Sequence, residues 1–290
     1  MRTSIAVLLF LGLVSGAGAQ QAPRGLGKFG AEQGGPRETG EPVDVELVLA
    51  VDVSWSMDRG EQEIQRNGYV AAFRNPEVQE AIARGNYGKV AVTFVEWAGS
   101  FTQNVVVPWT LIDSKATADA FAYRLSVEEP DRERRTSISG ALDFAAPMFA
   151  DNGFVGLRRV IDVSGDGPNN QGRPVLEARA EAIAKGITIN GLPLMTSNLS
   201  DGGYANWGSI PNLDRYYSDC VIGGPGAFMI PVNDWPQFPE AIRRKLVLEL
   251  AGDWPSRDAT AGLVVPVAAG SADCMVGENQ WNQRENMWNR

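Results

Sequence analysis

Short apolar runs alternate with amphipathic segments over residues 43–250 of the chain. Continuous apolar runs bounded by turn residues are typical of buried strands, whereas apolar residues at intervals of three and four are typical of helices. The pattern predicts strands over 43–52, 89–97, 101–111, 159–164, 187–194 and 227–232. It predicts helices over 59–73, 114–125, 136–149, 174–185, 212–220 and 235–250, with a further helical turn over 76–82.

The order of these elements predicts the fold class. Strands that alternate with helices favour an α/β fold, a doubly wound and mostly parallel sheet with helices on both faces. The short connection Ala98–Ser100 joins the second and third strands into a hairpin, so one edge strand is expected to be antiparallel. The chain shows no internal repeat, and we expect a single domain over residues 43–252.

The two ends of the chain have a different composition. Arg2, the apolar run Ile5–Val14 and the small residues Ala17–Ala19 predict a signal peptide over residues 1–19. That apolar run is too short to span a membrane, and no later run is long enough. Residues 20–42 predict a flexible leader, and residues 253–290 a tail packed on or tied to the domain. We therefore expect an exported protein, periplasmic or secreted, without a membrane span.

Charge and histidine content narrow the function. The chain has 26 Lys and Arg against 35 Asp and Glu, a formal charge of −9 that becomes −10 when Arg2 leaves with the signal peptide. Such a protein repels nucleic acid and anionic membranes, so neither is an expected partner. The absence of histidine from the chain excludes imidazole-dependent protease mechanisms and histidine zinc sites. The missing histidines make an enzyme less expected than a binding protein.

The chain contains two cysteines, Cys220 and Cys274. In an exported protein an isolated pair is most simply a disulfide, and the alternative is two buried thiols. The export signal and the even count favour the disulfide.

Oxygen-bearing side chains cluster at predicted strand ends. Asp52, Ser54 and Ser56 follow the first strand, Thr136 begins a helix, and Asp166 follows a later strand and precedes a glycine. Ligands bind at the carboxyl ends of strands in doubly wound sheets, so these three loops are expected to converge. Taken singly, each residue also fits a helix cap or a turn. Their order and their positions at strand ends favour one metal site.

The sequence Asp-x-Ser-x-Ser at residues 52–56 resembles the metal-ion-dependent adhesion site of von Willebrand factor type A domains, which have a Rossmann-like fold. In that family a threonine from a second loop and an aspartate from a third complete the site. The resemblance covers about residues 43–250 and implies a divalent cation held by Asp52, Ser54, Ser56, Thr136 and Asp166. The chain is also similar to a largely uncharacterised family of exported bacterial proteins of this type.

The implied donor set favours Mg²⁺, with Mn²⁺ and Ca²⁺ as alternatives. Two carboxylates and three neutral hydroxyls leave a divalent cation able to accept an anionic ligand. In the family this is how an acidic side chain of a partner is bound, so the resemblance implies a protein partner that offers Asp or Glu. The interpretation is a metal-dependent adhesion module that is not an enzyme. The alternatives are a metal-dependent hydrolase and a structural envelope protein with a stabilising metal.

Aromatic and basic residues near the motif have two interpretations each. Trp55 is either an exposed aromatic anchor or a ring packed beneath the loop. Arg132, Arg134 and Arg135, interleaved with acidic residues, form either a solvated loop or a rim that helps hold an acidic ligand.

Overall fold

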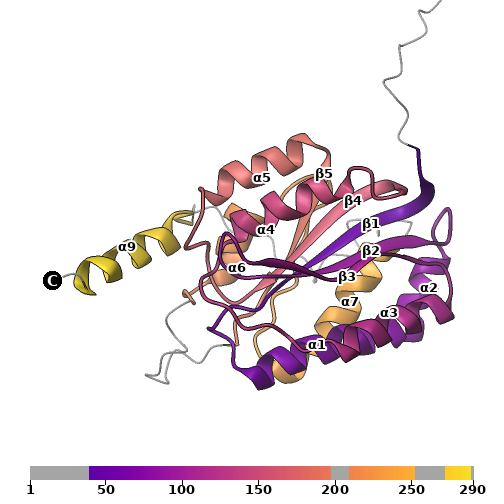
Figure 1. The fold of residues 1–290 in the computed structure, drawn as a ribbon, viewed down its shortest axis with the longest axis horizontal. Coiled ribbons are helices and arrows are strands. Elements are labelled where there is room, and N and C mark those ends of the chain that lie inside the picture. Colours follow the sequence, from indigo (N-terminus) through magenta and orange to yellow (C-terminus); the bar gives the residue numbers. More distant parts are fainter. Residues whose placement is uncertain (1–38, 197–208, 252–271, 289–290) are drawn as a thin grey trace, which may run out of the picture. The chain divides into compact units, whose positions relative to one another are not determined.

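A five-stranded sheet forms the centre of the computed structural model, which describes residues 39–196, 209–251 and 272–288 (Figure 1). The strand order is β3-β2-β1-β4-β5. β1 pairs in parallel with β2 and β4, β4 pairs in parallel with β5, and β2 pairs antiparallel with β3. The strands are β1 Glu41–Asp52, β2 Val90–Trp97, β3 Gln103–Ile112, β4 Phe154–Gly165 and β5 Ile187–Pro193. The predicted mostly parallel sheet with an antiparallel edge is confirmed.

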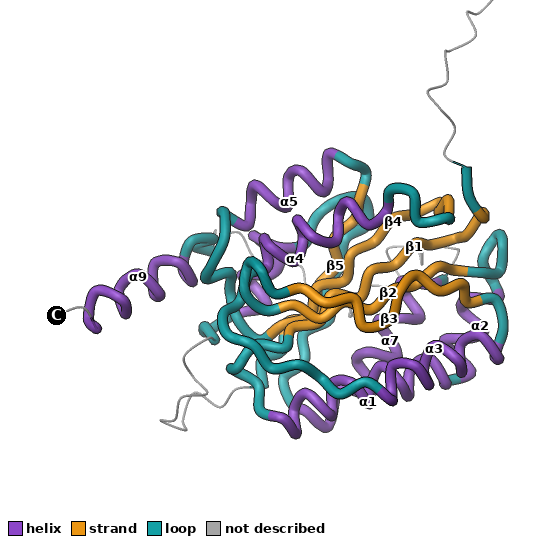
Figure 2. Tube along the Cα trace, viewed as in Figure 1, coloured by secondary structure: helices purple, strands orange, loops and turns teal. Residues whose placement is uncertain are grey.

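Helices cover both faces of the sheet, as Figure 2 shows. One layer contains α1 Arg59–Arg74, α2 Pro76–Ala83, α3 Lys115–Val127 and α7 Phe238–Leu250. The other contains α4 Ile138–Ala145, α5 Val175–Ala184, α6 Leu213–Tyr216 and the π-helix η3 Tyr217–Val221. A polar helix, α9 Val276–Trp288, follows in the tail, and the 3-10 turns are η1 Ala146–Phe149 and η4 Trp235–Gln237. The doubly wound arrangement predicted from the sequence is confirmed.

The alternation of side chains along β1 explains why that strand is apolar on both sides. Successive side chains of a strand point to opposite faces. Leu47 and Leu49 lie in the core beneath α1 and α7, whereas Val48 and Ala50 lie in the core beneath α4 and α5. A central parallel strand covered on both faces therefore has an almost continuous apolar sequence.

The helix predicted over residues 136–149 is shorter than expected. It begins at Ile138, and the Ser137 hydroxyl caps it by accepting a 3.1 Å hydrogen bond from the Gly140 amide. Thr136 therefore lies in the preceding loop, outside the helix. At the other end, residues Ala146–Phe149 tighten into a 3-10 turn that contains Pro147, whose ring cannot donate a helical hydrogen bond.

The last predicted strand, residues 227–232, is wrong as a regular strand. This segment runs parallel to β5 but pairs with it only through isolated bridges at Gly191–Met229 and Leu194–Val232. Pro231 lies between the bridges and has no amide hydrogen to donate. The Phe228 amide donates instead to the Asn190 side chain, at 3.0 Å. The Asn190 contact replaces one backbone hydrogen bond of the ladder, whereas the Ile230 and Val232 amides on either side of Pro231 still donate to the Gly191 and Pro193 carbonyls, at 3.1 and 2.9 Å.

The predicted signal peptide and nearly all of the predicted leader lie outside the described residues. β1 begins at Glu41, two residues before the predicted start of the domain. Within the described segments no helix has the length and apolar character needed to cross a membrane.

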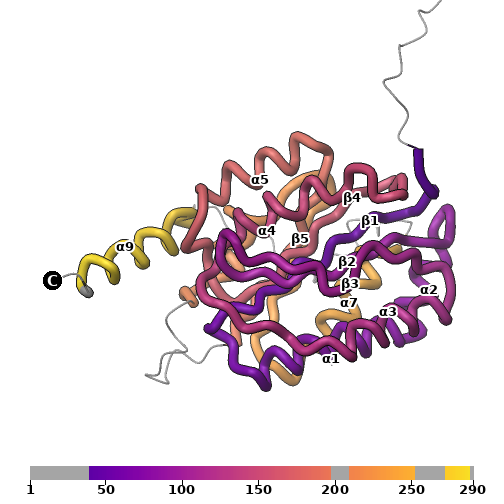
Figure 3. The backbone as a smooth tube through the Cα atoms, in the orientation of Figure 1, coloured from indigo at the N-terminus to yellow at the C-terminus, as the bar shows by residue number. Residues whose placement is uncertain are grey.

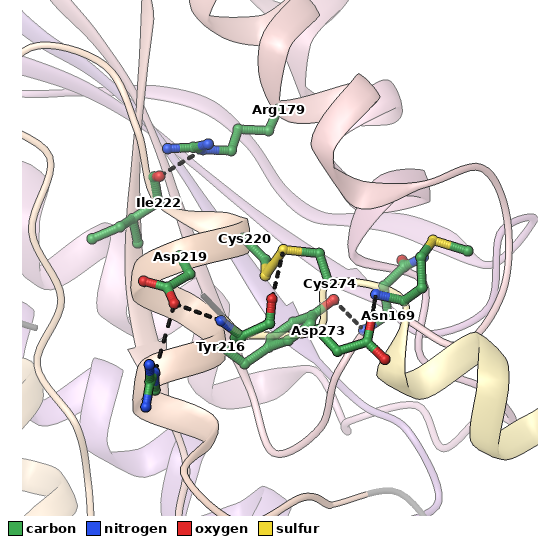
Figure 4. The surroundings of a disulfide bond; sticks show 11 residues. Asn169, Arg179, Tyr216, Asp219, Cys220, Ile222, Asp273 and Cys274 are labelled. Atoms are coloured by element: carbon green, nitrogen blue, oxygen red, sulfur yellow. Dashed lines mark hydrogen bonds and ion pairs between the residues drawn. A yellow bond between two sulfur atoms is a disulfide. The ribbon is translucent and has the colours of Figure 1, made fainter. Parts of the chain in front are cut away.

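The tail is tied to the domain by a disulfide between Cys220 and Cys274, whose Cα atoms are 5.5 Å apart (Figure 4). The predicted pairing is confirmed. The bond closes a loop with a sequence separation of 54, and a constraint of this kind stabilises a protein mainly by restricting the unfolded chain.

Replacing both cysteines by serine is expected to lower the free energy of unfolding by about 2–4 kcal/mol, because the unfolded chain regains the entropy of that loop. Urea denaturation of the oxidised protein and of the double variant measures this. A variant as stable as the wild type in non-reducing buffer would contradict it.

Candidate metal centre

Four of the five predicted ligands come together at the carboxyl ends of β1 and β4. The Ser54 amide donates to Asp52 Oδ1 at 2.7 Å, and the Ser54 and Ser56 hydroxyls are 2.8 Å apart. Ser56 Oγ donates to Asp166 Oδ1 at 2.7 Å. Because β1 and β4 are parallel neighbours, the residues that follow each strand lie at the same edge of the sheet. One chain of hydrogen bonds thus joins the motif loop to Asp166.

Thr136 reaches this edge through its backbone. Its amide donates to Asn170 Oδ1 at 3.0 Å, and the Asn170 amide donates to the Thr136 carbonyl at 2.8 Å. Just before it, the Glu133 amide donates to the Val53 carbonyl at 3.0 Å. The loop that carries Thr136 is therefore bonded to the motif loop on one side and to the Asp166 loop on the other.

Two carboxyl groups are buried in this site with little to balance their charge. Burial and the charge of Asp166 raise the pKa of Asp52 well above its ordinary value. Burial and the charge of Glu61 raise the pKa of Asp166 to about 6, and the hydrogen bond from Ser56 opposes that rise. Among the described residues, no hydrogen bond reaches the buried Asp52 Oδ2. A buried carboxylate oxygen without a donor is costly unless a cation neutralises it.

The donor set fits a hard divalent cation. Carboxylate and hydroxyl oxygens suit Mg²⁺, Mn²⁺ and Ca²⁺. In the described segments no three acidic or cysteine side chains gather into a metal-binding group, and at this site the side chains that accompany the two carboxylates carry hydroxyls. The orphaned Asp52 Oδ2 and the linked Ser54 and Ser56 hydroxyls are compatible with such a shell.

Tyr217 lies beside the site, although no feature of the sequence indicates it. A Cβ atom added to Gly165 would lie 2.9 Å from both the Tyr217 hydroxyl and Asp52 Oδ2, which places these two atoms around one glycine. Like Asp52 Oδ2, the buried Tyr217 hydroxyl makes no hydrogen bond within the described part of the chain. Burial and then the charge of Asp52 raise the pKa of Tyr217. Only glycine at position 165 leaves room for both oxygens.

Asn169 supports the loop that follows Asp166. Its Oδ1 accepts a hydrogen bond from the Ser139 amide at 2.9 Å, and its own amide donates to the Tyr216 hydroxyl at 3.1 Å. Asn169 thereby links that loop to α4 and to α6. The run Pro168–Asn170 is typical of a turn, and this composition was the only sequence signal for these residues.

Trp55 is half exposed, with 50% of its surface accessible. Hydrogen bonds hold both its side chain and its backbone carbonyl. Its indole Nε1 donates to the Arg132 carbonyl at 3.1 Å, and Arg132 donates to the carbonyls of Trp55 and Met57. The guanidinium of Arg134 lies 4.4 Å from the ring centroid. Arg132 and Arg134 therefore fix the Trp55 loop, and part of the ring still faces solvent.

The family model described as "Protein of unknown function (DUF1194)" matches residues 42–254. A comparison with curated proteins gives no match.

Several solved structures are similar to the chain. Proximal thread matrix protein 1 from the mussel byssus, with a zinc-occupied MIDAS motif, is 13% identical with a TM-score of 0.53, and the match covers 74% of this chain and 50% of that one. A von Willebrand factor type A protein from Catenulispora acidiphila is 16% identical with a TM-score of 0.46, covering 72% and 43%. The pilus adhesin SpaC from Lactobacillus rhamnosus GG is 14% identical with a TM-score of 0.49, covering 73% and 31%. The chain thus matches half or less of each of these proteins, and it has the von Willebrand A-type fold.

Proposed function

The chain belongs to the DUF1194 family of proteins of unknown function, and from that premise we propose that it is an exported, metal-dependent protein-binding module of the adhesion type. The observation that supports this most is the buried pair Asp52 and Asp166, joined at one sheet edge through the Ser54 amide and the Ser54 and Ser56 hydroxyls. Two buried carboxylates that repel each other favour a bound cation.

In this proposal Asp52, Ser54, Ser56, Thr136 and Asp166 hold a divalent cation, Mg²⁺ by preference and Mn²⁺ or Ca²⁺ as alternatives. The zinc-occupied motif of the mussel matrix protein supports a divalent ion at such a site. When bound, the cation supplies a position for an anionic ligand, and the partner provides an Asp or Glu side chain to fill it. The hydroxyls contribute no charge, so the ion keeps its attraction for that carboxylate.

The hydrogen bonds of the nearby Glu61 favour a binding protein over a hydrolase. A hydrolase commonly uses a side chain that accepts a proton from the attacking water. Glu61, whose charge raises the pKa of Asp166, already accepts hydrogen bonds from the Asp58 amide and from Trp235 Nε1, each at 2.8 Å. Histidine, the commonest alternative base, is absent from the sequence.

The proposed setting is outside the cytoplasm, in the periplasm or secreted, after removal of residues 1–19. The Cys220–Cys274 disulfide supports an oxidising compartment. The acidic chain, with a formal charge of −9, disfavours nucleic acid as a partner. The domain of residues 43–252 carries the site, and the tail of residues 253–290 is tied to it through Cys274.

The test is capture of a partner from envelope extract with and without EDTA. We expect capture by the wild type in Mg²⁺, loss of capture in EDTA, and loss in Mg²⁺ when Asp52 and Ser54 are both replaced by alanine. Truncating one side of a buried charged contact typically costs about 2–5 kcal/mol. The matched control is Asp119→Ala with Ser126→Ala, which removes the same two residue types from an exposed part of α3 and should capture normally.

Equal capture in EDTA, or by the Asp52 and Ser54 variant, would refute the adhesion-type function. Metal-dependent turnover of an ester or phosphate would favour the hydrolase alternative. Metal binding that stabilises the fold, without any metal-dependent partner, would favour the structural alternative.

A further inference from the structure

The tail helix α9 contacts the loop that carries Thr136. The Arg135 guanidinium lies 3.4 Å from the centroid of the Trp281 ring, and Arg135 Nη2 donates to Glu285 Oε1 at 3.2 Å. Trp281 Nε1 donates to the same carboxylate oxygen at 2.7 Å. Residues four apart on a helix share one face, so Trp281 and Glu285 together form a site for the Arg135 side chain.

Arg135 has an unusual backbone conformation. Its φ is +77°, in the left-handed region that residues with a side chain seldom adopt. Such a conformation persists when surrounding contacts fix it. Because Arg135 directly precedes Thr136, its contacts with α9 help to fix the direction in which the chain enters the ligand position.

α9 also contacts the loop that follows Asp166. Asn169 Nδ2 donates to Glu278 Oε1 at 2.7 Å. A Cβ atom on Gly277 would lie only 2.0 Å from the Asn169 carbonyl oxygen, so glycine is required for this approach. Asn169 in turn holds the Ser139 amide at 2.9 Å, in the helix after Thr136.

A covalent bond fixes the start of α9 to the body of the domain. Cys274 is bonded to Cys220, and the Ala272 amide donates to Asp219 Oδ2 at 2.8 Å (Figure 4). Cys220 belongs to the same π-helix as Tyr217, whose hydroxyl lies beside Gly165 at the metal centre. In Figure 3 the yellow α9 begins next to the loops at the carboxyl ends of the strands.

We propose that α9 is a clamp of the metal centre, in which Trp281, Glu285 and Glu278 act as positioning residues. They hold Arg135 and Asn169, and through them the loops of Thr136 and Asp166, while the disulfide keeps the helix in place. The proposal rests on the proposed function, since it assigns the clamp to that site. Residues that orient metal ligands without touching the metal typically change its affinity by about 10–100-fold.

Loss of the clamp should change the affinity for the metal and leave the stability of the fold almost unchanged, unlike the loss of a core contact. Glu285 is 50% exposed, and Trp281 is partly exposed, so neither belongs to the apolar cores. Removing the Trp281 ring should therefore loosen the hold of α9 on Arg135 and leave only the bond to Glu285, with little cost to folding. The expected effect falls on metal affinity, because looser loops must be ordered again when the ion binds.

The experiment uses the full mature chain and Mg²⁺ as the probe. We expect Trp281→Ala and Glu278→Met, which removes the acceptor of the Asn169 bond, each to weaken Mg²⁺ binding by roughly tenfold in titration calorimetry, with the melting temperature of the metal-free protein nearly unchanged. In the metal-free variants, amide hydrogen exchange should accelerate in residues 134–140 and 167–171. Asn282→Ala, on an exposed position of the same helix, is the matched control and should change neither quantity.

The outcomes separate the two proposals. A wild type that binds no divalent cation refutes the proposed function. A wild type that binds Mg²⁺, with Trp281→Ala, Glu278→Met and the Cys220→Ser and Cys274→Ser double variant all binding equally well, refutes the clamp alone. If Trp281→Ala fails to fold, Glu278→Met, which has a similar size but no oxygen to accept the Asn169 bond, tests the clamp through the other loop.

Discussion

Lys245→Ala is expected to lower the free energy of unfolding by about 3–5 kcal/mol, because it leaves two acidic side chains buried without their cation. Lys245 is fully buried in α7, with its Nζ 2.9 Å from Asp162 Oδ1 and 2.5 Å from Glu249 Oε1. Asn190 Nδ2 donates to the same Glu249 oxygen at 2.9 Å. The group joins α7 to the middle of β4 and β5, so its loss affects the contact between a helix layer and the sheet.

The loss should depend on pH in a defined direction. Burial and the charge of Glu249 raise the pKa of Asp162 to about 7, and Lys245 opposes that rise. The pKa of an unfolded aspartate is about 3.9, so the folded state binds the proton more tightly and stability rises as pH falls from about 7 toward 4. Without Lys245 the pKa of Asp162 should rise further. The variant should therefore lose less stability near pH 5 than near pH 7.5.

Urea denaturation followed by tryptophan fluorescence at both pH values measures this. Lys115→Ala is the matched control, since Lys115 makes the same i,i+4 pair with Asp119 on the surface, where its side chain is 72% exposed. Exposed pairs of this kind contribute about 0.3–0.5 kcal/mol. If Lys245→Ala lowers the free energy of unfolding by no more than Lys115→Ala does, the buried Lys245 group contributes no more to stability than an exposed pair.

The fold could be predicted because its signals are local. The apolar sequence of β1 and the Ala98–Ser100 connection each determine one part of the sheet without reference to distant residues. The prediction over residues 227–232 was wrong because a non-local contact, from the Phe228 amide to the side chain of Asn190 on β5, replaces a backbone hydrogen bond of the ladder. Asp162 was placed correctly in a strand, but its pairing with Lys245 depends on how α7 packs, which no sequence pattern shows.

In the candidate site, too, some residues could be predicted from local signals and others could not. Asp52, Ser54, Ser56 and Asp166 were predictable because strand ends of neighbouring parallel strands must meet. Thr136 was predicted as part of a helix, and it reaches the site because Asn170 holds its backbone in a loop. The sequence predicted a helix around Tyr217 and a tail tied to the domain, but it did not indicate that Tyr217 or α9 lies near the candidate site. One is a tyrosine within a short π-helix, and the other is a polar helix whose contacts with Arg135 and Asn169 are tertiary.

Asp52→Asn is expected to abolish Mg²⁺ binding while leaving the metal-free protein at least as stable at pH 7. Asparagine preserves the shape and can still accept the hydrogen bond from the Ser54 amide, which is 2.7 Å in the wild type. It removes a charge that burial and Asp166 both disfavour, which is why the pKa of Asp52 is raised. The same charge is the one that a cation would need. The substitution should thus weaken Mg²⁺ binding without destabilising the metal-free protein. This is expected of a site whose buried charge is unfavourable until a cation neutralises it.

Calorimetric titration and urea denaturation with and without Mg²⁺ test this together. Mg²⁺ at a hundred times its dissociation constant should add about 2.7 kcal/mol to the unfolding free energy of the wild type and nothing to that of Asp52→Asn. The matched control is Asp44→Asn, at the opposite end of the same strand, where the buried carboxylate accepts hydrogen bonds from the Tyr87 and Lys89 amides. That variant should lose stability yet bind Mg²⁺ normally. Equal stabilisation of Asp52→Asn and the wild type by Mg²⁺ would place the metal elsewhere, because a neutral amide cannot replace the buried carboxylate as an anionic ligand.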